Sequence, residues 1–463
     1  MSLPLPLPPP RRRPPLADLL ATNVTPLFFH LHLLLLLLII IVIGYASRTA
    51  RADCECGYLA AVHGSAGGDG GDGGDSSNRR ALFTDLLETD FARLAGGARN
   101  DDDDDDDDAD DDDDAAADPD ASPIEGWARQ AFNLTRERAR GEYGELFAVE
   151  NVGLVAAASS SFQGNVVGDE GGGWKEGGGR DGRGRKRKRG GAGLRLMVRA
   201  EIVDGMVPVA ELDTQRLDLM WGTFRAMMKV SSVKGTCAAF FWYFNDTQEI
   251  DMEFLSKDFN ASNGSYPVNL VLQSREAAAA GYDASGTGSH FVRALLPFDP
   301  TGDFHEYRID YLPGRVSFYA DGEPLADMEG AAVPSSPGHL ILQHWSNGNR
   351  YWSGGPPAED ASLLVSYVKA YFNSSTAQRR RDWEARCRDP TAPGAVCKIP
   401  DVTPGNWSAA ADWFFSDHAN MTNNQTASGQ SEEASSPSAE PSWSIIIICW
   451  LWLWLVAEFP FAV

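Results

Sequence analysis

The 463-residue sequence predicts an all-β protein whose main domain is an antiparallel β-sandwich. Between about residues 123 and 376, short apolar runs alternate with turn signals such as Leu312-Pro313-Gly314 and Asp321-Gly322, and there is little helical periodicity. About 250 residues of this kind suit one large sandwich rather than several small domains.

The expected strands follow one another along this region. Each is a run rich in Val, Ile, Leu, Phe and Tyr, such as CAAFFWYF at 237–244. We expect strands at 194–203, 221–230, 237–244, 249–256, 266–274, 305–312, 315–325, 339–346 and 362–372. The sequence shows no Gly-rich phosphate loop before a helix, no CxxC pair and no HExxH, so it gives no support for nucleotide or zinc chemistry. We expect no cofactor and no metal.

Three low-complexity segments are expected to be disordered or inserted loops. They are a Gly/Asp-rich stretch at 64–75, an acidic run at 101–114 and a Gly-rich insertion at 168–193. The acidic run supplies about half of the formal charge of −25, and it reads as a solvated linker or, alternatively, a Ca²⁺-binding segment. The basic RKRKR at 185–189 could suggest nucleic-acid contact, but on an exported chain we expect no nucleic-acid partner.

The N-terminus has the pattern of an export signal. Arg11, Arg12 and Arg13 precede the apolar stretch 27–45, and Ala50-Arg51-Ala52 fits a cleavage site. The stretch is long for a cleaved signal, so residues 1–52 are either a signal peptide or a retained signal anchor.

The C-terminus has a polar spacer followed by IIIICWLWLWLVA at 445–457. This order is typical of a lipid-anchor addition signal, while a retained hydrophobic anchor and a tail without function remain alternatives. We therefore expect a secreted or cell-surface protein, associated with a membrane through a terminal anchor and monomeric.

These features divide the chain into five parts. They are 1–52 (export signal), 53–122 (an N-terminal segment with Gly-rich and acidic linkers), 123–376 (the sandwich domain, with the 168–193 insertion), 377–427 (a Cys-containing extension) and 428–463 (a Ser-rich spacer and anchor signal).

Glycosylation sequons and cysteines both fit export. Eight Asn-x-Ser/Thr sites follow Ala52: Asn133, Asn245, Asn260, Asn263, Asn373, Asn406, Asn420 and Asn424. Cys54 and Cys56 lie too close to bond comfortably to each other, so each is expected to pair with Cys387 or Cys397 and to tie the two ends of the domain together. Cys237, in an apolar run, is left as a buried thiol.

Three carboxylates stand at alternate positions of the predicted strand 249–256: Glu249, Asp251 and Glu253. On a strand they share one face, and the apolar residues between them share the other. A solvated acidic edge strand or a Ca²⁺ site could hold such residues, but like charges side by side destabilise a sheet and the strand lacks an oxygen-rich loop. Catalysis accounts for the spacing: Cα atoms about 13 Å apart let two Glu side chains lean towards the ~5–5.5 Å separation of a retaining glycosidase pair.

Neighbouring strands offer a groove for a sugar. Phe241 and Tyr243 share one face of their strand, and Gln343 and Trp345 share one face of theirs. Aromatic faces can stack on the C–H side of a sugar, and an amide can bond its hydroxyls. Core packing would explain any one of the aromatic residues alone.

The segment GTCAAFFWYFNDTQEIDMEFLS resembles the catalytic region of glycoside hydrolase family 16, in which the hallmark is E-x-D-x-E or E-x-D-x-x-E. WGTFRAMMKV precedes it, and FHEYRIDYLPGRVSFYADGEPL and HLILQHWSNG follow it in the family's order. The cysteine-bearing ends resemble a fungal secreted branch of that family.

The resemblance implies a concanavalin A-like β-jelly roll and a function on cell-wall β-glucan. It makes Glu249 the nucleophile, Glu253 the acid/base and Asp251 the assisting carboxylate, and it places Arg225, Phe241, Tyr243, Gln343 and Trp345 in the cleft. The activity expected is endo-hydrolysis of β-1,3 and/or β-1,3-1,4 linkages. A transglycosylase or a lectin-like binding module on the same fold remains an alternative.

Overall fold

The computed structural model describes residues 34–35, 53–62, 79–96, 123–156, 191–282, 284, 290–403, 407–417, 421 and 425. The residues from Cys54 onward form one compact unit, which is the one described below. Apart from residues 34 and 35, the export signal lies outside the described residues, and so do the 64–75 and 101–114 segments, residues 168–190 of the predicted insertion and the 428–463 anchor signal. Residues 191–193, the end of the predicted insertion, are described, and Gly193 is the first residue of a strand. In the part that is described, no helix has the length and apolar character needed to cross a membrane.

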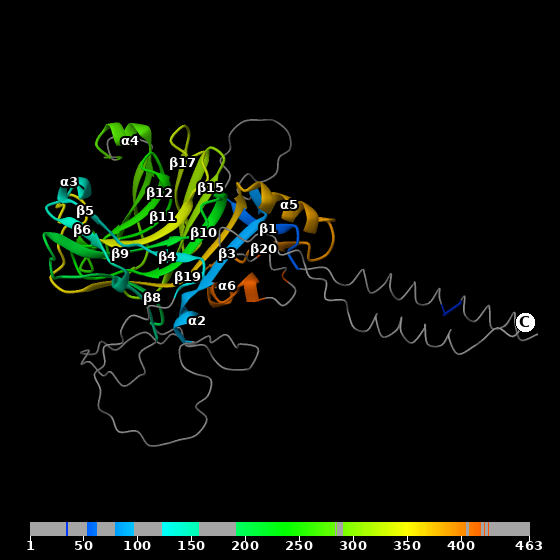
Figure 1. Ribbon diagram of the computed structural model, residues 1–463, viewed down its shortest axis with the longest axis horizontal. Helices are drawn as coiled ribbons and strands as arrows, with labels where there is room; N and C mark the ends of the chain where they lie inside the picture. The colour runs from blue at the N-terminus through cyan, green and yellow to red at the C-terminus, as the bar shows by residue number, and fades with distance from the viewer. Residues whose placement is uncertain are drawn as a thin grey trace, which may run out of the picture. The chain divides into compact units, whose positions relative to one another are not determined.

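Two large sheets pack face to face as a β-jelly-roll sandwich (Figure 1). The first, which we call the outer sheet, is antiparallel throughout its described pairings. Its strands, in spatial order, are β17 (Glu323–Glu329), β16 (Arg315–Ala320), β15 (His305–Leu312), β10 (Leu219–Lys229), β19 (Ala361–Ser374), β8 (Gly193–Val198) and β7 (Val152–Val155), with β3 (Asp85–Asp90) also paired to β19.

The second, which we call the cleft sheet, carries the candidate site. Its strands, in spatial order, are β14 (Phe291–Leu295), β13 (Pro267–Gln273), β12 (Gln248–Leu255), β11 (Cys237–Asn245), β18 (His339–Trp345), β9 (Met206–Thr214), β6 (Gly144–Phe147) and β5 (Phe132–Leu134), with β4 (Trp127–Arg129) also paired to β9. The β6–β9 pairing is parallel and the other described pairings are antiparallel.

The main core lies between the two sheets. The alternation in β12 works as the sequence predicts, because Ile250, Met252 and Phe254 are buried in this core. Burying each such side chain stabilises the fold by about 1.5–3 kcal/mol. Trp242 of β11 is fully buried as well, and its Nε1–H donates to the Leu219 carbonyl over 3.0 Å. β12 is therefore fixed by its apolar face, which leaves the acidic face turned the other way.

Each predicted run contains a strand, and the run 315–325 is divided by a turn at Asp321-Gly322 into β16 and β17. The sequence did not predict several of the strands. Among them are β9, which lies inside the cleft sheet between β18 and β6, and β14, which lies at its edge. The outer sheet also takes in β3, which precedes residue 123, the expected start of the domain.

Both ends of the unit are tied together. Cys54 is bonded to Cys397 and Cys56 to Cys387, so each cysteine of the N-terminal pair joins one of the C-terminal pair. Around these bonds lies a small sheet in the order β2 (Arg79–Phe83), β1 (Gly57–Val62) and β20 (Val396–Lys398). The helices described are α2 (Phe91–Gly96), α3 (Arg136–Ala139), α4 (Arg275–Ala279), α5 (Ala377–Arg386) and α6 (Trp407–Ala411).

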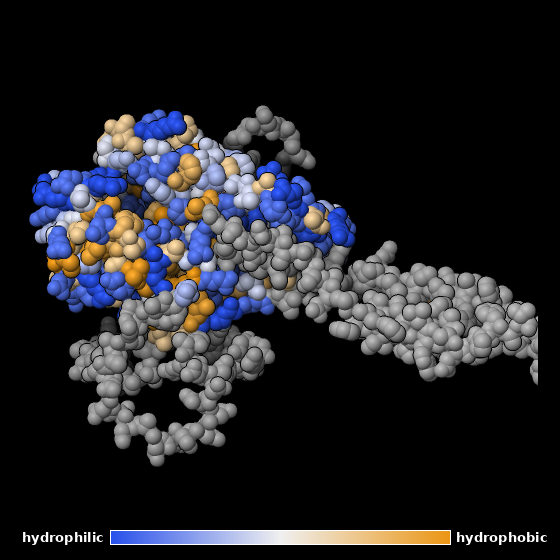
Figure 2. Space-filling view, viewed as in Figure 1, coloured by the Kyte–Doolittle hydropathy of each residue, from blue (hydrophilic) through white to orange (hydrophobic). Residues whose placement is uncertain are grey.

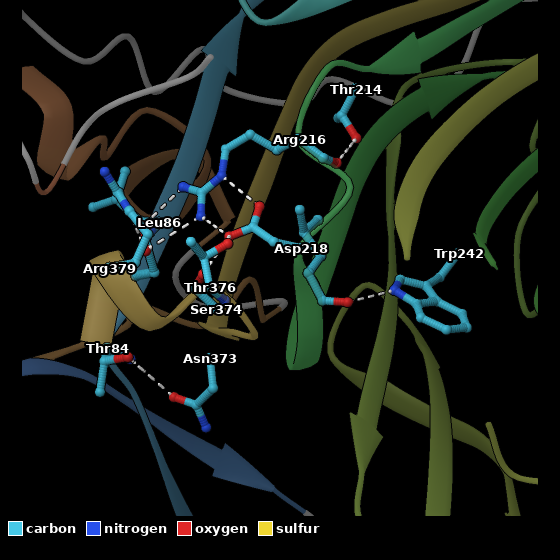
Figure 3. Close-up of polar contacts among 12 residues, drawn as sticks. Thr84, Leu86, Thr214, Arg216, Asp218, Trp242, Asn373, Ser374, Thr376 and Arg379 are labelled. Atoms are coloured by element: carbon cyan, nitrogen blue, oxygen red, sulfur yellow. Dashed lines mark hydrogen bonds and ion pairs between the residues drawn. The ribbon is translucent and has the colours of Figure 1, made fainter. Parts of the chain in front are cut away.

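A buried charge cluster fixes β3 and α5 to the sandwich (Figure 3). Arg216 contacts Asp85 over 3.0 Å and Asp218 over 2.6 Å. Arg379 of α5 reaches the same Asp85 over 2.6 Å. Because Arg216 and Asp85 are both almost fully buried, losing either partner would leave a charge in the interior without compensation.

Candidate active site

The three carboxylates of β12 lie on the face of the cleft sheet that is turned away from the core. Glu253 stands opposite Ala239 of β11, and Glu249 stands opposite Tyr243. Asp251, between them, is 4% exposed, whereas the two glutamates are partly buried. The strand therefore presents the three acids in one row.

A cleft of roughly 1030 Å³ lies over this row. It crosses the strands of the sheet, because its lining reaches from β5 and β6 at one edge to β13 on the far side of β12. Its lining includes Phe132, Phe147, Glu145, Arg140, Phe241, Asp246, Glu249, Asp251, Glu253, Gln273, Tyr282, Gln343, Trp345, Asn347, Tyr351 and Trp352.

Two donors converge on one oxygen of Glu253. The Trp352 Nε1–H donates to Glu253 Oε1 over 3.0 Å. The thiol of Cys237, a fully buried residue at the start of β11, donates to the same oxygen over 3.6 Å. Both contacts hold the carboxyl group in one orientation, and both stabilise its ionised form.

Burial raises the pKa values of all three acids, and charge repulsion raises those of Glu249 and Asp251 further. For Glu253, burial raises the pKa to about 7, against the opposing effect of the Trp352 and Cys237 donors. For Glu249, burial again raises the pKa, and the charges of Glu253 and Asp246 add to it. The row can therefore hold protons near neutral pH, as an acid catalyst requires.

Asp251 holds its proton more strongly than an ordinary aspartate does. Burial raises its pKa well above the ordinary value, and the charges of Glu249 and Glu253 raise it further. It shares a hydrogen bond with Glu249, and that bond lowers the pKa of Glu249. A protonated Asp251 that donates to an ionised Glu249 accounts for both effects.

Glu145 of β6, which lines the cleft, forms a second acidic group with Glu211 of β9. Burial, followed by the negative charge of Glu211, raises the pKa of Glu145 to about 8. Burial also raises the pKa of Glu211, which accepts a hydrogen bond from Gln343 Nε2. Neutral carboxyl groups both donate and accept, so this part of the cleft suits a ligand rich in hydroxyl groups. Among the described residues no set of His, Cys, Asp and Glu has the arrangement of a metal site.

Of the residues predicted to bind a ligand, Phe241, Gln343 and Trp345 line the cleft with the three carboxylates. Tyr243 lies just beyond this lining, where its hydroxyl donates to Asp246 Oδ1 over 2.7 Å. The parity argument for these strands thus places the side chains on the expected face.

The prediction for Arg225 is wrong. Arg225 lies on β10 of the outer sheet, is 1% exposed and does not line the cleft. Its guanidinium donates to the Pro400 carbonyl and pairs with Asp401, both over 2.8 Å. It therefore attaches the C-terminal extension to the outer face of the sandwich.

Sequence reasoning missed several cleft residues outside the strand that carries the acids. Arg140, Asp246, Tyr282 and Asn347 all line the cleft, and all lie in loops or turns. Trp352, one of several aromatic residues that follow the Asn-Gly-Asn turn after β18, also lines the cleft, as the run of aromatic residues there indicates.

The model of glycosyl hydrolases family 16 matches residues 209–363, which include all three carboxylates. Residues 209–363 form a family 16 glycosyl hydrolase domain. β5 and β6 and α3, which complete the cleft, lie before the matched part.

Relatives of the family 16 domain include β-glucanases from bacteria. The β-glucanase of Paenibacillus macerans is 31% identical over 131 residues, which is 27% of this chain and 48% of that protein. The β-glucanase of Bacillus amyloliquefaciens is 29% identical over 131 residues, with the same two shares of 27% and 48%. The chain thus spans about half the length of these relatives.

Among solved structures, similar chains include a Bacillus licheniformis β-glucanase, with 21% identity, a TM-score of 0.31 and coverage of 38% of this chain and 78% of that one. An apo Crh5 transglycosylase matches with 19% identity, a TM-score of 0.31 and coverage of 39% and 72%.

Proposed function

We propose that the protein is a retaining, endo-acting glycoside hydrolase that cleaves β-1,3 and/or β-1,3-1,4 linkages in cell-wall β-glucan. The observation that carries this proposal is the row of Glu249, Asp251 and Glu253 in one cleft, with pKa values that burial raises in all three. The family 16 domain and the β-glucanase relatives support it.

In the first step, a carboxylate oxygen of Glu249 attacks the anomeric carbon. The bond from that carbon to the leaving sugar's oxygen breaks as Glu253 gives its proton to the oxygen. Asp251 donates a hydrogen bond to Glu249, which orients it and keeps it ionised. The product of this step is a glycosyl ester on Glu249.

In the second step, water attacks the same carbon while Glu253 accepts a proton from the water. The ester bond breaks and returns the Glu249 carboxylate. Two displacements, each with inversion, leave the configuration of the sugar unchanged. The raised pKa of Glu253 suits both of its duties, because the group must hold a proton in one step and release it before the other.

Azide rescue distinguishes the two glutamates. Glu249→Gln should be folded and inactive, and Glu249→Ala with azide and an aryl β-glycoside should give a glycosyl azide of inverted configuration. Glu253→Ala should still form the ester from the aryl glycoside and should give an azide of retained configuration. Glu323→Gln, an exposed carboxylate of β17, is the matched control and should keep full activity. Full activity in Glu249→Gln would overturn the assignment.

A cell-wall transglycosylase is the second candidate. On the β14 side of Glu253, Trp352 contacts Phe291 with ring centroids 6.3 Å apart, and Tyr351 is 73% exposed. These aromatic residues could hold an acceptor sugar that replaces water in the second step. We propose that hydrolysis dominates at low substrate concentration. Incubation with long β-glucan and a fluorescent oligosaccharide acceptor tests this, since transfer of label into polymer faster than new reducing ends appear would favour the transglycosylase. A lectin-like module would show neither.

We also propose an exported, glycosylated, surface-anchored monomer of the fungal secreted branch of the family. The Arg11–Arg13 and 27–45 pattern, the eight sequons and the 445–457 tail support this proposal. Release of the protein from membranes by a phosphatidylinositol-specific phospholipase would support the lipid anchor. Retention after that treatment, with extraction only by detergent, would favour a hydrophobic anchor instead.

A further inference from the structure

We propose that Arg140 and Tyr282 form a bridge over the cleft, so that an unbranched glucan chain passes beneath it and a chain with side-chain sugars must break it. This inference rests on the proposed function. The guanidinium carbon of Arg140 lies 4.3 Å from the ring centroid of Tyr282, which is a cation–π contact. Both residues line the same cleft as the three carboxylates.

The two residues come from opposite ends of the strands. Trp345 and Leu255 both stand opposite Cys237, so they mark one end of the cleft sheet. The turn that follows Trp345 holds the Arg140 segment at this end. β13 ends at Gln273 beside Glu249, at the other end of β12, and Tyr282 follows from there. Because the cleft crosses the strands, these two ends are its two walls.

The two residues also come from distant strands. Arg140 precedes β6 and Tyr282 follows β13 and α4, and four strands lie between β6 and β13 in the cleft sheet. At a spacing of about 4.8 Å, that separation is roughly 24 Å. In Figure 1, α3 (cyan) lies beside β5 and β6, and α4 (green) lies beyond the strands near β12. A 4.3 Å contact between these segments is therefore made only by reaching across the cleft.

The Arg140 end of the bridge is firmly held. Asn347 Nδ2 donates to the Ala139 carbonyl over 2.6 Å, and Asn349 Nδ2 donates to the Arg140 carbonyl over 3.2 Å. Gly141 packs so closely on Asn347 that a Cβ atom there would lie 2.1 Å from the Asn347 carbonyl oxygen. The backbone that carries Arg140 is thus fixed. Figure 2 shows mainly hydrophilic residues (blue) at the left of the molecule, where Figure 1 places α3, the helix whose C-cap is Arg140.

The Tyr282 end is held through Asp246. The Tyr282 hydroxyl donates to Asp246 Oδ2 over 3.3 Å, while Tyr243 of β11 donates to Asp246 Oδ1. The charge of Arg140 lowers the pKa values of both Glu249 and Glu253, which agrees with a guanidinium that lies over the carboxylate row. The bridge and the acids are therefore parts of one enclosure.

The outer side of the bridge faces solvent, since Tyr282 is 37% exposed and Arg140 is exposed. A cation–π contact of this kind is weak enough to open and strong enough to discriminate. A linear chain lies beneath the bridge without disturbing it. A glucosyl branch at that position projects outwards into the bridge and separates Arg140 from Tyr282.

The test compares kcat/KM for a linear β-1,3-glucan and for a β-1,3-glucan with β-1,6-linked glucosyl branches. We expect the wild-type full chain to favour the linear polymer roughly tenfold, and Arg140→Ala or Tyr282→Ala to reduce this ratio to about two or less, as the loss of one cation–π contact predicts. The double variant should reduce it no further than either single variant. Tyr282→Phe keeps the ring and should keep most of the ratio.

Arg136→Ala is the matched control, because it removes an exposed arginine of the same helix that does not line the cleft. It should leave the ratio unchanged. Using the ratio corrects for any effect of the lost Arg140 charge on Glu249 and Glu253, since both substrates meet the same acids.

Hydrolysis of both polymers with a ratio that none of these variants changes would overturn the bridge and leave the proposed function standing. Absence of any action on β-glucan by the wild type would overturn the proposed function and this inference with it. Additive effects of Arg140→Ala and Tyr282→Ala on the ratio would also overturn the bridge, because two partners in one contact cannot act independently.

Discussion

Trp352→Phe should move the basic limb of the pH–rate profile to higher pH. The indole Nε1–H donates to Glu253 Oε1 over 3.0 Å, and a donor of this kind favours the ionised carboxylate. Phenylalanine keeps an aromatic ring in the cleft but removes the donor. The carboxyl group of Glu253 then keeps its proton to a higher pH, so the acid form that we propose protonates the leaving group persists further into the alkaline range.

The size of the shift follows from the strength of the bond. A hydrogen bond to a charged group contributes about 1.5–3 kcal/mol, which corresponds to about 1–2 pKa units. The Cys237 thiol still donates to the same oxygen and water can reach the partly buried carboxyl group, so we expect a shift of about one unit from the wild-type pKa near 7.

The assay is kcat/KM for a soluble β-glucan between pH 4 and about 10, since this quantity reports the pKa values of the free enzyme. Trp383→Phe is the matched control. Trp383 lies on α5, and its indole donates to the Cys56 carbonyl, so its loss should leave the pH–rate profile unchanged. A basic limb that stays fixed or moves to lower pH in Trp352→Phe would refute the reasoning, whatever happens to the absolute rate.

Four further outcomes are expected. Cys237→Ala should shift the same limb in the same direction but less than Trp352→Phe, because a thiol is a weak donor and its contact with Glu253 is 3.6 Å long. Glu145→Gln should raise the melting temperature at pH 9 but not at pH 4. The pKa of Glu145 is about 8 in the folded state, above its value in the unfolded chain, so the wild type loses stability as the pH rises through about 8. Arg216→Leu should lower the free energy of unfolding by about 3–5 kcal/mol in denaturant titrations, because Asp85 loses a buried partner. Removing both disulfides should lower it by about 5 kcal/mol, and removing either alone by far less, since the remaining bond still joins the same two segments.

The acidic row could be predicted from the sequence because the signal is local. Alternation along eight residues of β12 decides which side chains enter the core and which face the cleft. The strands with strong apolar runs were found for the same reason. β5 and β6 carry weaker patterns of three and four residues, and no local signal says that β6 pairs with β9 some 60 residues later.

Arg225 shows the limit of reasoning by position. Parity along β10 separates its two faces, but it does not say whether the polar face meets a substrate or another part of the chain. In the structure that face is covered by the C-terminal extension, which the Arg225 contacts with Pro400 and Asp401 hold in place.

The cleft walls depend on contacts between segments far apart in the chain, and this is why the sequence could not supply them. Trp352 reaches Glu253 across 99 positions, and Asn347 reaches Ala139 across 208. Neither contact leaves a periodic pattern, since both partners lie in or beside turns. The catalytic chemistry is thus encoded in one strand, whereas the part of the site that could select a substrate is assembled from loops on both walls. If the proposed function holds, substitutions in those loops alter which glucan is cleaved while the acids of β12 remain in register.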